Sequence, residues 1–132
     1  MNEEETIEKI LSMKTIAVVG LSDNSGRPSY GVASYLSEAD YKIVPVNPSI
    51  SSWKNLKVYP DLSSIPFKVD VVDIFRKPNA VLPIVQEAIK IGAKAVWMQE
   101  GVVNDEAAEL AEKSGMLVVM DRCMMKEREK RK

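Results

Sequence analysis

The chain has 132 residues, of which 45% are hydrophobic and 28% charged, and its formal net charge is −1. This length predicts one domain with a sizeable core, and the balanced charge leaves no global field that would attract nucleic acid or a membrane surface. The chain has no histidine and one cysteine, which excludes a Ser-His or Cys-His nucleophile pair, a His-ligated zinc ion and a four-cysteine metal site within it.

The same features predict the compartment. No apolar run approaches the roughly 18 residues that a membrane-spanning helix needs. The first residues, 1–5, are acidic, whereas a signal peptide begins with basic residues. The single Cys123 cannot form an intramolecular disulfide, which agrees with a reducing environment. We therefore expect a cytoplasmic protein with no membrane partner.

The first third of the chain reads as helix, strand, loop and helix. Ile7, Ile10 and Leu11 are spaced as on one face of a helix, which predicts a helix over 4–12 within an N-terminal segment 1–13. The continuous apolar run 15–20 is typical of a fully buried strand. Residues 21–28 form a polar loop, and a second helix follows over 29–39 with Ser29 as its N-cap.

The alternation continues to the end of the chain. Further strands are predicted over 41–46, 57–59, 69–75, 94–98 and 116–120. Between them come a one-turn helix or loop over 61–65, a helix over 80–91 capped by Asn79, and a helix from Asn104 to about residue 114. Residues 126–132 mix charges densely and predict a frayed tail. The expected fold is α/β: one Rossmann-like, doubly wound, mostly parallel sheet over residues 1–132.

In such a sheet, ligands bind outside the carboxyl ends of the strands. After the first strand, Gly20 would allow a tight turn, Gly26 a close backbone approach, and a helix N-terminus would favour phosphate. A plain strand-to-helix loop explains this composition equally well. Ser22 replaces the second glycine of the dinucleotide fingerprint, and Asn47 stands where an acidic residue would bind the NAD ribose, so the sequence argues against NAD.

Three later strand ends carry further candidates. Phe75, Arg76 and Lys77 suit phosphate and stacking on a base, although two solvated charges before a helix would look the same. Gln99 and the Gly101 backbone could hydrogen-bond an amide-rich chain. Cys123 is either a small buried apolar residue or, beside Arg122, a thiolate.

Together these segments resemble the small bacterial and archaeal CoA-binding proteins, whose fold is that of the N-terminal CoA-binding domain of the succinyl-CoA synthetase α subunit. The match runs from about Thr15 to Glu127. It rests on seven segments in order: Ile16–Ser22 (IAVVGLS), Arg27–Val32 (RPSYGV), Val44–Pro48 (VPVNP), Lys57–Pro60 (KVYP), Val71–Pro78 (VVDIFRKP), Ala95–Gly101 (AVWMQEG) and Val119–Met124 (VMDRCM). The chain departs from its relatives at Asn55, where they often have glycine, and after Cys123 to Glu127, where they commonly have a histidine.

The resemblance implies coenzyme A as the ligand and assigns parts of the site to it. Residues of the first loop would cradle the diphosphate, namely Ser22, Ser25, Arg27, Pro28 and Ser29. Pro45 and Asn47 would flank the adenosine. The nucleotide or its phosphates would meet Phe75, Arg76 and Lys77, and the pantetheine arm would follow Gln99, Glu100 and Gly101.

The leading hypothesis is a module that binds CoA or an acyl-CoA without catalysis: a carrier, a sensor or an accessory subunit, alone, as a homodimer or in a larger assembly. Related ligases use a phosphohistidine in a second domain, and this chain has no histidine. Two alternatives stay open. Cys123 could exchange disulfides with CoA, or the chain could be an interaction protein with a vestigial nucleotide pocket.

Overall fold

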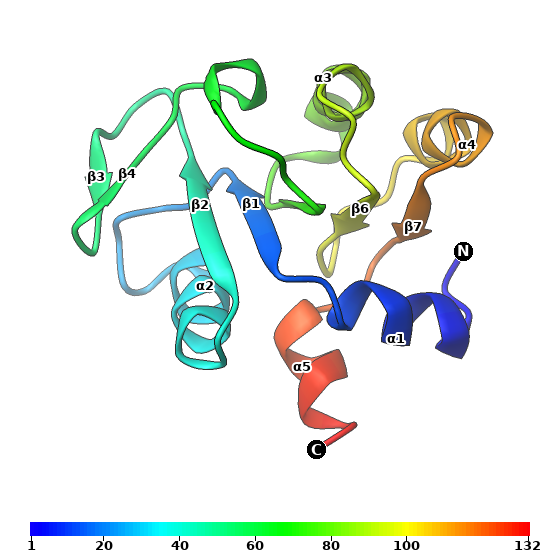
Figure 1. The fold of residues 1–132 in the computed structure, drawn as a ribbon, viewed down its shortest axis with the longest axis horizontal. Coiled ribbons are helices and arrows are strands. Elements are labelled where there is room, and N and C mark those ends of the chain that lie inside the picture. The colour runs from blue at the N-terminus through cyan, green and yellow to red at the C-terminus, as the bar shows by residue number, and fades with distance from the viewer.

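Five parallel strands form the central sheet of the computed structural model, which describes residues 1–132. Their order is β2-β1-β5-β6-β7 (Figure 1), with bounds β1 Thr15–Val19, β2 Lys42–Val46, β5 Val71–Ile74, β6 Ala95–Met98 and β7 Leu117–Val119. The chain leaves β1 for one neighbour and then returns to its other side at β5. The point where strand order reverses therefore lies between β1 and β5, and the predicted doubly wound fold is confirmed.

Helices cover both faces of the sheet, and the strand residues are accordingly mostly apolar. On one face lie α1 (Glu4–Leu11), α2 (Pro28–Glu38) and α5 (Met124–Glu129); on the other lie α3 (Val81–Lys90) and α4 (Asp105–Lys113) (Figure 1). The buried side chains accordingly form two clusters, of 20 residues on the α3–α4 side and 18 on the α2–α5 side. No helix here has the length and apolarity needed to cross a lipid bilayer.

The predicted strand 57–59 is wrong as a strand of the main sheet. A separate antiparallel hairpin forms instead from β3 (Ser52–Trp53) and β4 (Leu56–Lys57), beyond the β2 edge (Figure 1). Its turn residues Lys54 and Asn55 have φ of 48° and 66°, as a tight two-residue hairpin turn requires. Tyr59 contributes only one parallel bridge, to Val46.

The start of α2 also differs from the prediction. Arg27 occupies the N-cap position and Pro28 the first helical position, where its missing N–H costs nothing. Ser29, predicted to be the cap, lies inside the helix and is 4% exposed. Its Oγ accepts a hydrogen bond from the Ser22 N–H at 3.0 Å. Ser29 therefore fixes the loop after β1 rather than the helix end.

Two other predicted caps can be compared with the structure. Asn104 is confirmed, since its Oδ1 accepts a hydrogen bond from the Ala107 N–H at 3.0 Å. Asn79 is not a cap: it lies in the short 3₁₀ turn η2 (Pro78–Ala80), and α3 begins after it. The predicted one-turn helix is present as the 3₁₀ turn η1 (Leu62–Ser64), which Asp61 caps.

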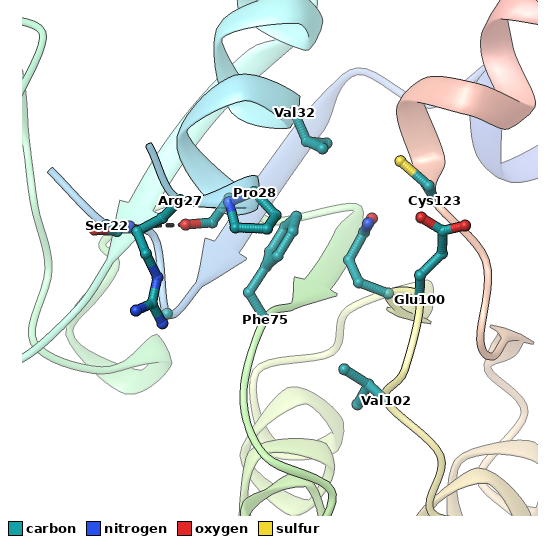
Figure 2. Close-up of a pocket in the computed structure, with 11 residues that line it drawn as sticks. Ser22, Arg27, Pro28, Val32, Phe75, Glu100, Val102 and Cys123 are labelled. Carbon is teal, nitrogen blue, oxygen red and sulfur yellow. Dashed lines mark hydrogen bonds between the residues drawn. The ribbon is translucent and has the colours of Figure 1, made fainter. Parts of the chain in front are cut away.

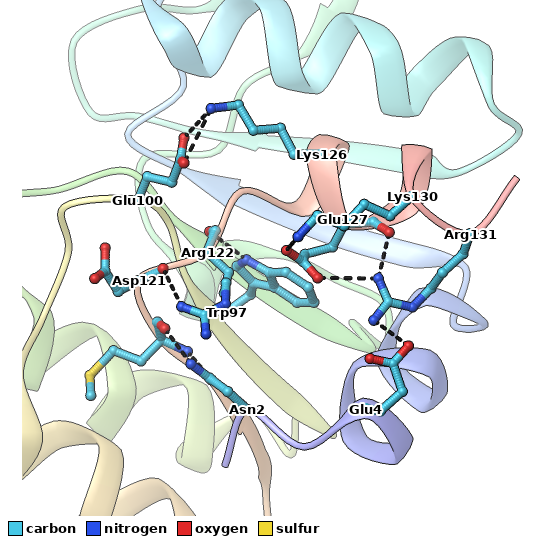
Figure 3. Close-up of polar contacts among 11 residues, drawn as sticks. Asn2, Glu4, Trp97, Glu100, Asp121, Arg122, Lys126, Glu127, Lys130 and Arg131 are labelled. Carbon is cyan, nitrogen blue, oxygen red and sulfur yellow. Dashed lines mark hydrogen bonds and ion pairs between the residues drawn. The ribbon is translucent and has the colours of Figure 1, made fainter.

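The predicted frayed tail is wrong, because residues 124–129 form α5. Met124 is fully buried and Glu127 is 5% exposed. Burial acts to raise the pKa of the Glu127 carboxyl, but hydrogen bonds from Lys130 and Arg131 outweigh it and lower that pKa. Arg131 also pairs with Glu4 of α1 at 2.6 Å (Figure 3). These contacts join the two ends of the chain.

One buried carboxyl has no partner. Asp73 lies in β5 between Val18 of β1 and Trp97 of β6 and is fully buried. Neither of its carboxyl oxygens forms a hydrogen bond. Burial raises the pKa of this carboxyl well above its ordinary value. The folded protein therefore holds the Asp73 proton at pH values where the unfolded chain releases it.

We expect Asp73→Val to stabilise the protein, and to do so more at neutral than at acid pH. Below its unfolded-state pKa the carboxyl is protonated in both the folded and the unfolded chain. As the pH rises above that value, the parent loses stability, because folding must then retain a proton that the unfolded chain releases. The Tm of variant and parent should thus diverge as the pH rises above about 4, the ordinary pKa of an aspartic acid side chain. A Tm difference that does not change with pH would contradict this account of Asp73.

Candidate functional site

Two adjoining hollows lie at the carboxyl ends of β1, β5 and β6. The first, here called the inner cavity, has a volume of about 310 Å³ and is lined by these predicted residues: Gly20, Ser22, Arg27, Pro28, Ser29, Phe75, Gln99, Glu100 and Cys123. The second, the outer groove, has about 590 Å³ and is lined by Gly20, Ser22, Arg27, Asn47, Phe75, Arg76 and Lys77 among others. Four of these residues line both, so the hollows form one continuous site.

Three predicted residues line neither hollow. Ser25 is exposed in the loop between β1 and α2. Pro45 is buried in β2 and lines a separate surface hollow of about 170 Å³. Gly101 has φ of +83°, and its N–H donates to Asp121 Oδ1 at 2.8 Å. The predicted donor at Gly101 is thus already used within the protein.

Gly20 allows the ends of β1 and β5 to meet. Its φ is +86°, a region that residues with a side chain rarely adopt. A Cβ atom at this position would lie 2.4 Å from the Phe75 carbonyl oxygen and 2.9 Å from Arg76 Cδ. The missing side chain therefore accommodates the neighbouring strand end, in addition to any ligand.

The loop after β1 is held in place from three directions. Besides the bond from Ser22 to Ser29, the Trp53 indole N–H donates to the Ser22 carbonyl at 3.1 Å. The Asn47 side-chain amide donates to the Leu21 carbonyl at 3.0 Å. A loop with its own backbone groups bound in this way is preorganised before any ligand arrives.

The outer groove carries unpaired positive charge. Arg27, Arg76 and Lys77 are exposed, and none of them forms an ion pair. The N-terminus of α2 adds the partial positive charge of a helix dipole. Of the acids on the opposite wall, Glu87 binds the backbone N–H groups of η1 and Asp61 caps that turn. This arrangement favours an anion.

The inner cavity is more apolar than the outer groove, and the Gln99 amide offers it a hydrogen-bond donor. Val32, Phe75 and Val102 contribute to its wall (Figure 2). Gln99 is 4% exposed, and its Oε1 accepts from the Met124 N–H at 3.2 Å. No protein group accepts a hydrogen bond from its Nε2, because the only bond of this side chain uses Oε1. The cavity thus offers apolar contact together with one amide N–H₂.

The sulfur of Cys123 belongs to this inner cavity. The residue is 5% exposed, lines the cavity and occupies the N-cap position of α5. Lys126, one of two neighbouring cations, binds the Glu100 carboxylate at 3.0 and 3.2 Å, and this bond raises the pKa of the Lys126 ammonium. Arg122 donates to the Asp121 carbonyl (Figure 3). Both cations therefore have partners other than the thiol.

Sequence reasoning missed parts of the walls. Val32 follows Ser29 by one helical turn, so helical spacing from the predicted loop would have placed it on the same face. Val102 lies four residues beyond the end of β6. Trp53, which lines neither hollow but holds the Ser22 carbonyl, belongs to the hairpin that was not predicted. Three or more metal-ligating side chains of the His, Cys, Asp or Glu type gather nowhere in the structure.

Comparison with known proteins gives the family. The profile of a family described as "CoA binding domain" matches residues 14–129. The chain is 35% identical over 123 residues to the uncharacterized protein YneT of Bacillus subtilis, covering 93% of this chain and 91% of that protein. It is also 30% identical over 101 residues to acetate–CoA ligase (ADP-forming) II of Archaeoglobus fulgidus, covering 75% of this chain but 15% of the ligase.

A solved structure gives the same fold. A hypothetical protein from Pyrococcus horikoshii superposes with a TM-score of 0.93 at 42% sequence identity. The match covers 97% of this chain and 91% of that one. The shared fold therefore extends over nearly the full length of both chains.

Gly20→Ala is expected to destabilise the protein by about 1–3 kcal/mol, the cost of a strained backbone conformation. The added Cβ also collides with the Phe75 carbonyl oxygen, so the strand ends must separate. The matched control is Gly31→Ala in α2, where a Cβ meets nothing within 4 Å. That control should be neutral or gain about 0.5–1 kcal/mol. Chemical denaturation measures the free energy of unfolding of both variants. An equal change in the two variants would contradict the role given to Gly20.

Proposed function

Because this chain belongs to the family of CoA-binding domains, we propose that it binds coenzyme A, free or acylated, in the outer groove and inner cavity. The observation that carries the proposal is the division of one continuous site into a cationic part and an apolar part. Coenzyme A has the same division, with phosphates at one end and an amide-bearing arm ending in a thiol at the other. We place the nucleotide in the outer groove and the arm in the inner cavity.

The phosphates are assigned to the cations without partners. Arg27, Arg76 and Lys77 are the side chains whose charge the protein itself leaves unpaired in this site. Guanidinium groups bind phosphate through two parallel hydrogen bonds, and the α2 N-terminus adds backbone donors. The base is assigned to the same groove, where Phe75 offers a ring for contact.

The pantetheine arm is assigned to the inner cavity. Its methylene and methyl groups would contact Val32, Val102 and the Phe75 ring. The Gln99 Nε2, which faces the cavity and has no protein acceptor, would donate to one of its amide carbonyls. The thiol or acyl end would then lie at the Cys123 side of the cavity.

We propose a binding role without catalysis, as a carrier, sensor or accessory subunit in the cytoplasm, alone or in a homodimer or larger assembly. The chain spans 15% of the Archaeoglobus ligase it matches, so the ligase reaction is not transferred to it. It also lacks histidine, and hence any phosphohistidine of its own. A CoA-binding module that acts with other proteins is consistent with both facts.

CoA should bind more tightly than NAD, and ADP should bind more weakly than CoA. The end of β2 offers Asn47, whose side chain already bonds Leu21 and Ser49, and no carboxylate for an NAD ribose. ADP lacks the arm that fills the inner cavity. Titration calorimetry with the three ligands measures this. Equal affinities for CoA and NAD would contradict the assignment, and no binding of any nucleotide would favour an interaction protein with a vestigial pocket.

Arg27→Ala and Arg76→Ala should each weaken CoA binding by about 1.5–3 kcal/mol, the range for hydrogen bonds to charged groups. At about 1.4 kcal/mol per factor of ten, this is roughly a 10- to 150-fold rise in Kd. Lys9→Ala is the matched control, because Lys9 is an exposed, unpaired cation on α1 away from the site. Parental affinity in both folded arginine variants would show that the phosphates bind elsewhere.

A further inference from the structure

The Cys123 sulfur can be reached through the inner cavity but hardly from bulk solvent. The residue is 5% exposed, yet it lines the cavity wall (Figure 2). Figure 2 shows its sulfur turned toward Val32, which lines the same hollow. Pro28 and Glu100, also lining residues, are exposed and mark the open rim. A molecule must therefore enter the cavity to react with this thiol.

A second observation indicates what kind of molecule the cavity receives. Gln99 is buried to more than nine-tenths and lines the cavity with an Nε2 group that has no acceptor. Its Oε1 binds the N–H of Met124, the residue after Cys123, so the amide and the thiol occupy the same corner. This amide donor faces the cavity and has no protein acceptor, so it is available to a ligand that carries a carbonyl oxygen. A thiol-terminated, amide-bearing chain satisfies both groups at once.

We propose that Cys123 is a modification site that forms a mixed disulfide with coenzyme A, supplied as CoA disulfide. The inference rests on the proposed function, since the bound nucleotide positions the sulfur. The Cys123 thiol loses its proton to solvent, and the thiolate attacks the nearer sulfur of the CoA disulfide. One sulfur–sulfur bond forms to Cys123 as the original one breaks, and the second CoA leaves as a thiolate that takes up a proton.

Burial makes this reaction selective. The cations beside Cys123 are engaged elsewhere, Lys126 by Glu100 and Arg122 by a backbone carbonyl. Small disulfides without affinity for the site therefore meet a hindered thiol with no free cation beside it. CoA disulfide is held by the groove, which raises its effective concentration at the sulfur. The leaving half can exit over the exposed rim between Pro28 and Glu100.

The test is intact-mass spectrometry of the whole chain after incubation with CoA disulfide or with glutathione disulfide at equal concentration. Since the chain has a single cysteine, any disulfide adduct lies at Cys123. We expect one CoA per chain, removed by dithiothreitol, forming roughly tenfold or more faster than the glutathione adduct. Arg76→Ala should slow formation of the CoA adduct, Lys9→Ala should form it at the parental rate, and Cys123→Ser should form no adduct with either disulfide.

Two outcomes would overturn the inference: no CoA adduct on a chain that binds CoA in calorimetry, or equal rates with both disulfides. The same rates measured in denaturant, where the site is lost, should be equal and serve as the reference for intrinsic thiol reactivity. A chain that binds no CoA under reducing conditions would instead overturn the proposed function, so the two failures are distinguishable.

Discussion

The close contact between the ends of β1 and β5 is the constraint on which the site depends. Gly20 lies against the Phe75 carbonyl, and any side chain there would separate the two strand ends. Gly20 and Phe75 line both the inner cavity and the outer groove. The turn at Gly20 directs the following loop toward α2, and the residues after Phe75 carry the cations. One missing side chain thus determines how two distant parts of the sequence face each other.

Around that contact, the polar groups fall into two sets: those with hydrogen-bond partners within the protein and those without. Backbone groups of the first loop are bound by Ser29, Trp53 and Asn47, and the acids of the groove bind the η1 turn. The groups left without protein partners are the cations of the groove and the Gln99 amide. These groups converge on one continuous site and have no protein partners, so they are available to a ligand that carries both anionic groups and carbonyl oxygens. The Asp73 carboxyl, which has no hydrogen bond, is paired with Trp97 in the sheet, and these two residues precede Phe75 and Gln99 by two positions along the chain.

The sequence predicts the sheet well, because its strands are continuous apolar runs whose burial on both faces leaves little ambiguity. It fails for α5, where Met124 and Glu127 are buried but stand among exposed charges that hide the helical pattern. The sequence also does not predict the hairpin. Its turn residues, Lys54 and Asn55, adopt a left-handed backbone conformation, but they lack the glycine that usually marks such a turn. For the site, the rule of strand ends places Arg76 and Gln99 at the carboxyl edge. It does not place Val32 or Val102, since these depend on how helices and loops close over the sheet.

The central claim is that one ligand occupies both hollows, with its charged end among the free cations and its thiol end beside Gln99. A crystal structure of the protein with CoA under reducing conditions tests this directly. The account predicts phosphates within hydrogen-bond distance of Arg27 or Arg76, and an arm whose carbonyl accepts from the Gln99 amide. A CoA molecule bound outside the groove, or one whose arm leaves the inner cavity empty, would contradict it.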